Sequence, residues 1–367
     1  MTQYTWNLEE LLSKKKEYKE KANLYEELLD LYSELIENYD YRITPTDPEY
    51  ENDVLGNIYD SISREKVDLV TNAIEITKDF YVKQENFKYS TLILNDEQLI
   101  DRTRALFTKI PNQQFLNKFD YFTNPDNHLL HIKHHKKLST DYLGITLVDT
   151  FKHQSFGLVA RHNNLEDIVT LGHEIFHMIV REQEQPFFCT TNKSIYTETE
   201  GFFADLLLEH LLELNNYNKQ ETQNIRKNDL TNSIDSIQTS FIVKNGLASI
   251  KQGDIKFNKL KSTLSKYHVS FPVCKKNFLT FLTSTEEDIE TDMDYAVSYL
   301  TALDLFKQYE TDPERALYHL LQIPRLEGTE PKKDLEKINV TFFEDGYKNL
   351  ENQCKKLLKT RTTSYKK

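Results

Sequence analysis

The sequence predicts a mainly α-helical protein with one small β-sheet, and three observations lead to this fold class. Apolar residues recur at helical spacing over most of the 367 residues. Three short β-rich segments follow one another between residues 128 and 160, separated by polar linkers. The chain has no internal repeat and no low-complexity linker. A change of character near residue 120 predicts a helical N-terminal lobe, residues 1–120, and a second domain, residues 121–367.

The composition argues against nucleic-acid and membrane partners. The formal net charge is −12, whereas phosphate binding requires a concentrated basic face. The sequence has no apolar run of about 18 residues that could span a bilayer. Its N-terminus, MTQYTWNLEELLSKKK, lacks the apolar stretch of a signal peptide, so we expect a cytoplasmic protein. The three cysteines are widely separated, which predicts neither a disulfide framework nor a cysteine metal site.

The N-terminal lobe is predicted to contain an antiparallel helical hairpin and a further helix. Apolar residues at helical spacing mark the two arms, Asn7–Tyr39 and Glu49–Val82. The segment Phe87–Leu94 predicts a strand or an extended link. Asn95 and Gln98 then resemble a capping box that opens the next helix.

The small sheet is predicted from three consecutive strands, His128–Ile132, Ile145–Val148 and Phe156–Ala160. A helix, Leu165–Val180, follows the last strand directly, so the sheet should lie beside it. An edge strand of this sheet could pair with an extended peptide, which is the strand-addition mode of recognition.

The remainder of the chain is predicted to be helical. Asp312 as N-cap, with Pro313 at the first helical position, marks one helix start clearly. The other predicted helices begin at Thr197 or span Leu230–Ile250, Ile255–Tyr267, Asp294–Tyr309 and Phe342–Leu358.

The predicted helix Leu165–Val180 carries His173, Glu174 and His177 in the order H-E-x-x-H. Residues four apart lie on one face of a helix, so both imidazoles can bind one metal ion. Glu174 lies close enough to polarise a water on that ion. The flanking residues are apolar on most of the circumference, which predicts a buried helix. Because buried ionisable groups must be paired or bind a metal, the pattern indicates a zinc site.

A catalytic zinc site needs a third protein ligand, and the next helix offers two carboxylates. The continuation H-x-x-G-x-x-H is absent, since Val180 and Gln183 occupy its glycine and histidine positions. Glu198 and Glu200 follow the motif in the helix that begins near Thr197. We favour Glu198 because Asp205 lies two turns later on the same face, where it could accept a hydrogen bond from a ligating histidine. Glu200 remains the alternative.

These segments resemble the oligoendopeptidase F and thimet oligopeptidase family of zinc peptidases. FGLVARHNNLEDIVTLGHEIFHMI is similar to that family's strand, acidic linker and metal-binding helix, and ETEGFFADLLL to its next helix. YAVSYLTALDLF, from Tyr295, resembles its tyrosine-rich helix, with Tyr299 on the last tyrosine. The resemblance covers residues 156–205 and continues from Tyr295. It implies a shortened, divergent member with a zincin-like metallopeptidase fold, in which residues 121–367 form the catalytic domain.

The resemblance also implies the roles of individual residues. His173, His177 and Glu198 would hold one zinc ion per chain, and Asp205 would hold a ligating histidine. Glu174 would act as the general base. Tyr299 or Tyr295 would donate a hydrogen bond to the developing oxyanion, although core packing explains the spacing of these two tyrosines equally well.

Four departures from the family pattern stand out. Asp205 occupies the position of a glutamate, and Gly201 that of a serine. The family has a histidine shortly before its tyrosine-rich helix, but the corresponding segment here, TSTEEDIETDMD, contains none. The chain is also shorter than the typical member.

We therefore expect a zinc-dependent endopeptidase that hydrolyses short, unstructured peptides with metal-activated water and a glutamate base. The alternative is a peptide-binding or regulatory protein that keeps the metallopeptidase fold with weakened catalysis. The sequence indicates neither the natural peptide nor the oligomeric state.

Overall fold

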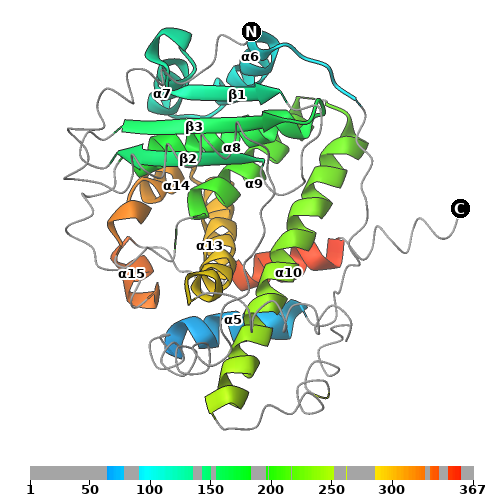
Figure 1. Ribbon diagram of the computed structural model, residues 1–367, viewed down its shortest axis with the longest axis vertical. Coiled ribbons are helices and arrows are strands. Elements are labelled where there is room, and N and C mark those ends of the chain that lie inside the picture. Colours follow the sequence, from blue (N-terminus) through cyan, green and yellow to red (C-terminus); the bar gives the residue numbers. More distant parts are fainter. Residues whose placement is uncertain are drawn as a thin grey trace, which may run out of the picture. The chain divides into compact units, whose positions relative to one another are not determined.

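The computed structural model describes residues 64–77, 91–134, 143–149, 154–182, 196, 198–215, 217–251, 262, 286–326, 331–338 and 346–356 (Figure 1). The predicted helix Asn7–Tyr39 and nearly all of the predicted helix Ile255–Tyr267 lie outside these residues. The chain divides into two compact units. The first unit contains the sheet, and the described residues of the second form helices and short connections. The lobe boundary expected near residue 120 remains a prediction.

The sheet of the first unit has three strands, β1 (Leu130–His134), β2 (Gly144–Asp149) and β3 (Gln154–Arg161), in the order β1-β3-β2. The central strand β3 is parallel to β1 and antiparallel to β2. Seven of its eight residues are buried, as expected for a strand that is paired on both edges. All three predicted strands are confirmed, with bounds that differ by one or two residues.

The helices α6 (Asp96–Phe107) and α7 (Gln113–Phe122) also belong to the first unit. The predicted capping box opens α6: the Asn95 side chain accepts from the Gln98 backbone N–H at 2.8 Å, and the Gln98 side chain accepts from the Asn95 N–H at 3.0 Å. Helix α7 was not predicted. It is capped by Asn112, whose side chain accepts from the Gln114 N–H at 2.9 Å.

The helix α8 (Glu166–Arg181) packs against β2, β3, α6 and α7, and Figure 1 shows it running along one face of the sheet. Thirteen of its sixteen residues are buried, which confirms the predicted buried helix. Phe176 of α8 joins an aromatic core with Phe107 and Phe115, at ring-centroid distances of 5.5 and 5.1 Å. This packing fixes α8 between the sheet and the two preceding helices.

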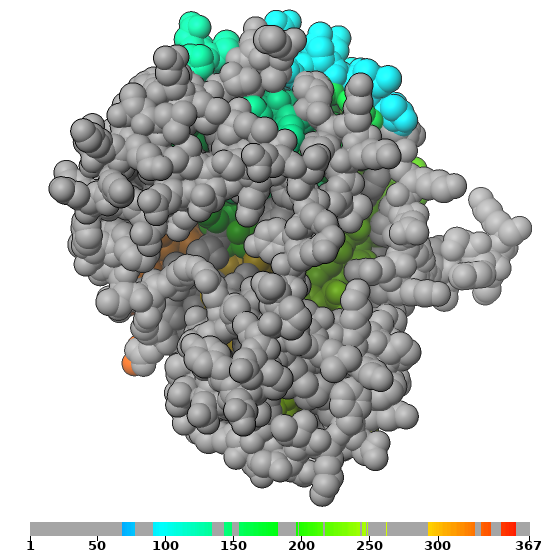
Figure 2. Space-filling view, in the orientation of Figure 1, coloured from blue at the N-terminus to red at the C-terminus, as the bar shows by residue number. Residues whose placement is uncertain are grey.

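In the described part of the second unit, helix α13 (Glu286–Tyr309) packs against α14 (Pro313–Leu320) and α5 (Arg64–Thr77). Asp312 caps α14 with Pro313 at the first helical position, as predicted. Part of α10 reaches the surface drawn in Figure 2, where it is yellow-green. The remaining bounds are α10 (Lys219–Lys251) and α15 (Pro331–Lys337), and residues 346–356 are also helical.

The helix α9 (Thr199–Leu214) begins in the second unit and continues in the first from Ala204. The fold class is therefore mainly helical with one small three-stranded sheet, as predicted. Within the part of the chain that the structure describes, no helix has the length and apolar character needed to cross a membrane.

Candidate metal centre

The turn between β3 and α8 is held by buried charged groups that fix where α8 begins. The Asp167 carboxylate accepts hydrogen bonds from the backbone N–H groups of His162 and Asn163, both at 2.8 Å. Burial raises the pKa of Asp167, and these two hydrogen bonds and the nearby Arg161 oppose that shift. The Arg161 guanidinium also donates to Asp96 at 3.0 Å. This network ties α8 to the end of the central strand.

His173 and His177 lie one turn apart on α8, and their Nε2 atoms are 3.0 Å from each other. The Nδ1 atom of His173 lies 2.9 and 3.1 Å from the two carboxylate oxygens of Asp205 on α9. Because a carboxylate accepts, Nδ1 of His173 carries the proton and its Nε2 presents a lone pair. Asp205 therefore sets the tautomer of His173 that can bind a metal through Nε2.

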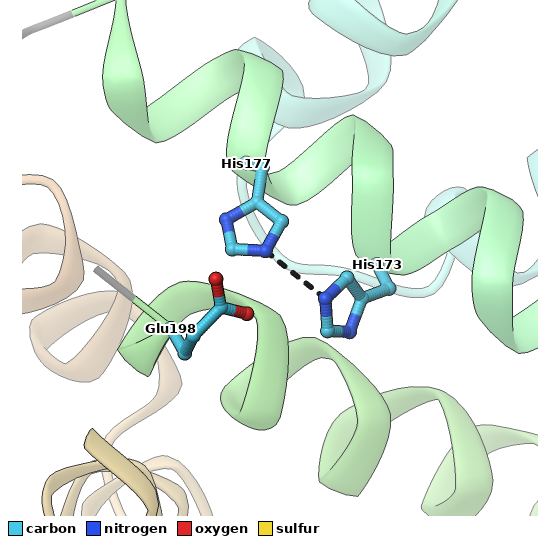
Figure 3. A group of neighbouring side chains, drawn as sticks. All are labelled: His173, His177 and Glu198. Atoms are coloured by element: carbon cyan, nitrogen blue, oxygen red, sulfur yellow. Dashed lines mark hydrogen bonds between the residues drawn. The ribbon is translucent and has the colours of Figure 1, made fainter. Parts of the chain in front are cut away.

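Glu198 lies directly before α9 and completes a group of three possible metal ligands (Figure 3). One ligand atom from each of His173, His177 and Glu198 lies within 4.8 Å of the others. The Glu198 backbone N–H donates to Ser298 Oγ at 3.4 Å. Glu200, the alternative ligand, is buried and is not a member of this group. Among the described residues, no other set of three or more such side chains meets the same distance criterion.

The donor set fits a zinc ion. Zinc binds imidazole nitrogen and carboxylate oxygen at about 2.0–2.2 Å, and two nitrogens on a tetrahedral ion lie roughly 3.3 Å apart. The observed Nε2 separation of 3.0 Å is close to that spacing. Three protein ligands leave the fourth position for water or substrate, which is the arrangement of catalytic zinc sites.

Gly172 on α8 permits the close approach of α9. A Cβ atom at Gly172 would lie 2.2 Å from Cδ1 of Leu208, which is fully buried. Any larger side chain would therefore push against α9 next to His173 and Asp205. Sequence reasoning did not single out Gly172, because its partner is 36 residues away in the chain.

The Glu174 side chain contacts strand β2. It is buried, and its Oε2 atom accepts a hydrogen bond of 2.7 Å from the Thr146 hydroxyl. Gly144 lies against the same carboxylate, since a Cβ atom there would be 2.3 Å from Oε1. Sequence reasoning missed both contacts. A glycine inside a predicted strand is the signal that could have indicated a close approach at Gly144.

Tyr295 and Tyr299 lie on α13, where they pack around Phe202 at ring-centroid distances of 6.0 and 5.3 Å. Tyr299 is buried, and its hydroxyl donates to Gln353 Oε1 at 3.1 Å. Tyr299 therefore belongs to the core of the second unit, whereas Tyr295 is half-buried. Their catalytic role remains a prediction.

Glu166, in the first turn of α8, is a further ionisable group near the histidines that the sequence did not suggest. Its pKa is raised to about 7, mainly by burial and to a smaller extent by the neighbouring carboxylates of Asp167 and Asp205. A hydrogen bond with Asn164 acts in the opposite direction. The protonation of Glu166 therefore changes within the neutral pH range.

The comparisons with known proteins show similarity at the level of structure. No family model and no curated protein matches the sequence. A crystal structure from Bacillus anthracis assigned to oligoendopeptidase F superimposes with a TM-score of 0.52 and 12% identity, covering 84% of this chain and 56% of that chain. For a structure assigned as a peptidase from Chlamydophila abortus, the TM-score is 0.50 with 12% identity, covering 86% and 56%.

PZ peptidase A, solved with an inhibitor, gives a TM-score of 0.51 with 11% identity, covering 87% of this chain and 59% of that chain. The present chain thus spans between 56% and 59% of the length of these three structures. At these identities the likeness concerns the fold. The chain therefore has the fold of the oligoendopeptidase F peptidases, which is the fold that its sequence motifs predicted.

Proposed function

We propose that the protein is a cytoplasmic zinc-dependent endopeptidase that hydrolyses short, unstructured peptides. The observation that carries the proposal is the group of His173, His177 and Glu198, which lies beside a buried glutamate on the same helix as the two imidazoles. The fold shared with known peptidases supports it.

In this proposal His173 and His177 hold the ion through Nε2, and Glu198 holds it through its carboxylate. Zinc bound there would act as a Lewis acid that lowers the pKa of water and polarises the scissile carbonyl. Asp205 keeps the proton of His173 on Nδ1 and restrains the imidazole ring.

Glu174 acts as the general base. It follows His173 directly, so its carboxylate lies on the adjoining face of α8. In the reaction it accepts a proton from the attacking water and returns that proton to the leaving amine. Burial limits the access of bulk water to this carboxylate, which favours transfer of the proton between the attacking water and the leaving amine.

The peptide substrate adds to the sheet along β2 in this proposal. Among the described strands, β2 pairs with β3 alone, so it forms one edge of the sheet, and it is also the strand that contacts Glu174. Main-chain pairing would hold an extended peptide with little dependence on its sequence. Tyr299 or Tyr295 is the proposed hydrogen-bond donor to the charge that develops on the carbonyl oxygen.

The test uses a library of quenched fluorescent peptides with the purified protein, with and without a chelator. We expect hydrolysis that the chelator abolishes and zinc restores. Glu174→Gln should retain zinc and lose roughly 10²- to 10⁴-fold in kcat. Glu213→Gln, on α9, is the matched control and should behave as wild type.

Unchanged turnover in Glu174→Gln with zinc retained would refute the proposed role of this residue. Peptide binding that persists with chelator and without cleavage would support the alternative, a peptide-binding protein with the fold of a peptidase.

A further inference from the structure

Thr146 lies in β2, on the side of the strand that faces α8, and its hydroxyl contacts the next helix twice. The Oγ1 atom lies 2.7 Å from Glu174 Oε2 and 3.2 Å from the Glu174 backbone oxygen. Thr146 is 8% exposed and Glu174 is 4% exposed. A threonine hydroxyl carries one proton, and the shorter, charge-assisted contact to the carboxylate is the one that receives it.

Gly144, two residues earlier in β2, faces the same carboxylate because side chains alternate along a strand. The position of its absent Cβ lies 2.3 Å from Glu174 Oε1 and 2.6 Å from Cδ. Thr146 thus holds Oε2 of Glu174 by a hydrogen bond, and Gly144 leaves the space that Oε1 occupies. Among the described residues, Thr146 supplies the only hydrogen bond recorded for the Glu174 carboxylate.

A general base works only within hydrogen-bond reach of the proton that it removes, and a glutamate side chain has several rotatable bonds. Catalytic side chains are therefore held by neighbours that fix their rotamers. We propose that Thr146 is a positioning residue that holds the Glu174 carboxylate in its proton-accepting orientation, with Gly144 providing the room for it. This inference rests on the proposed function and adds a specific role for β2.

Ser155 offers a matched comparison, because it also links the sheet to α8 by a hydroxyl. Its Oγ donates to the backbone oxygen of Met178 at 3.0 Å, from β3 and one turn beyond Glu174. It is fully buried, as Thr146 nearly is. Loss of the Ser155 hydroxyl therefore reproduces the structural consequence of losing a strand-to-helix hydrogen bond without touching the Glu174 carboxylate.

The kinetic experiment compares Thr146→Val, Thr146→Ser and Ser155→Ala in the zinc-loaded full chain with a cleaved peptide of the library. We expect Thr146→Val to lower kcat by about 10-fold while KM changes less than about twofold, since an interaction needed for chemistry is removed and ground-state binding is kept. Thr146→Ser keeps the hydroxyl and should restore kcat to within about threefold. Ser155→Ala should leave kcat and KM as in wild type.

The same substitutions in the Glu174→Gln background separate positioning from packing. If Thr146 acts through the carboxylate, Thr146→Val should reduce the residual rate by less than about twofold when the base is absent. An equal loss in both backgrounds, or a loss in Ser155→Ala that matches Thr146→Val, would overturn the proposal.

A crystal structure of zinc-free Thr146→Val provides a readout that does not depend on activity. We expect the Glu174 carboxylate to leave its position beside Gly144 and to adopt another rotamer, whereas in Ser155→Ala it should stay. A carboxylate that remains in place in Thr146→Val would contradict the inference. If wild type shows no chelator-sensitive hydrolysis, the proposed function fails, and the crystal structure still decides whether Thr146 positions Glu174.

Discussion

Helix α8 approaches α9 on one side and β2 on another, and at both contacts a glycine allows the close approach. At the α9 contact Gly172 faces the apolar side chain of Leu208, whereas at the β2 contact Gly144 faces the carboxylate of Glu174. The first glycine serves the packing of two helices. The second leaves space for a side chain that the proposed reaction uses.

The polar contacts of α8 also differ between its α9 side and its β2 side. His173 and Glu174 are neighbours in sequence, so on a helix they point about 100° apart and meet different partners. His173 is bound by Asp205 from α9, and Glu174 is bound by Thr146 from β2. In the proposed function, metal binding and proton transfer would therefore depend on different contacts of one helix, and substitutions should affect them separately.

The largest effect in this comparison is expected at Asp205. Asp205→Asn replaces an ionic acceptor of His173 Nδ1 by an amide, and loss of such a partner typically weakens metal binding by about 10- to 100-fold. Competition with a coloured chelator measures the change in Kd for zinc. Asp205→Glu keeps the carboxylate and should retain most of the affinity. An unchanged Kd in Asp205→Asn would mean that α9 does not support the metal site through His173.

Gly144→Ala should reduce kcat by about 10-fold, because general-base efficiency depends on placement of the carboxylate. The new methyl group would displace the flexible Glu174 side chain rather than backbone, so the loss of kcat should exceed what any change in stability explains. Steady-state kinetics and thermal melting check the two parts of this expectation. Full activity in Gly144→Ala would show that the space beside Oε1 is not needed.

Gly172→Ala should lower stability and leave kcat nearly unchanged, in contrast to Gly144→Ala. Overpacking against buried Leu208 costs about 1–3 kcal/mol, and replacing a helical glycine by alanine returns about 1 kcal/mol. We therefore expect a net loss of about 1 kcal/mol in the free energy of unfolding, measured in urea. Zinc content and kcat per folded molecule should stay near wild type. A large loss of kcat with unchanged stability would reverse the distinction between the two glycines.

An effect on stability alone is expected at Glu166, whose pKa is raised to about 7 mainly by burial. Between about pH 4.5 and pH 7 the folded protein keeps the proton of Glu166, whereas the unfolded chain releases it. The contribution of Glu166 to the free energy of unfolding is therefore complete below about pH 4.5 and is lost as the pH rises through 7. In Glu166→Gln this loss should disappear. Between pH 5 and pH 8 the free energy of unfolding of the variant should rise by about 1 kcal/mol relative to that of wild type. This figure allows for the partial solvent exposure of Glu166. The free energies of unfolding are measured in urea at each pH. The same pH dependence in both proteins would contradict this expectation.

Much of the fold could be predicted because its signals are local. The capping box at Asn95, the N-cap at Asp312 and the three strands each depend on a few consecutive residues. Helix α10 begins at Lys219, whereas the sequence predicted a start near Leu230. The prediction was late because the first turns of α10 are polar and lack a clear apolar stripe. Helix α7 was missed although its buried phenylalanines have helical spacing, since Pro111 indicated a break directly before it.

The candidate site could be predicted only in part for the same reason. The spacing of His173 and His177 is a property of one helix, and Glu198 was favoured because Asp205 follows it by two turns. The sequence left Glu200 open, because the distance between two helices does not follow from the sequence of either. Thr146 carries no motif, and its contact with Glu174 joins residues 28 positions apart.

The central claim is that two histidines of α8 and Glu198, directly before α9, together bind one zinc ion. Anomalous diffraction at the zinc edge, from crystals of the full chain grown with zinc, tests it most directly. The account predicts one strong peak per chain, within bonding distance of Nε2 of His173, Nε2 of His177 and the Glu198 carboxylate. A peak bound by Glu200 with Glu198 turned away, or no peak beside the two imidazoles, would contradict it.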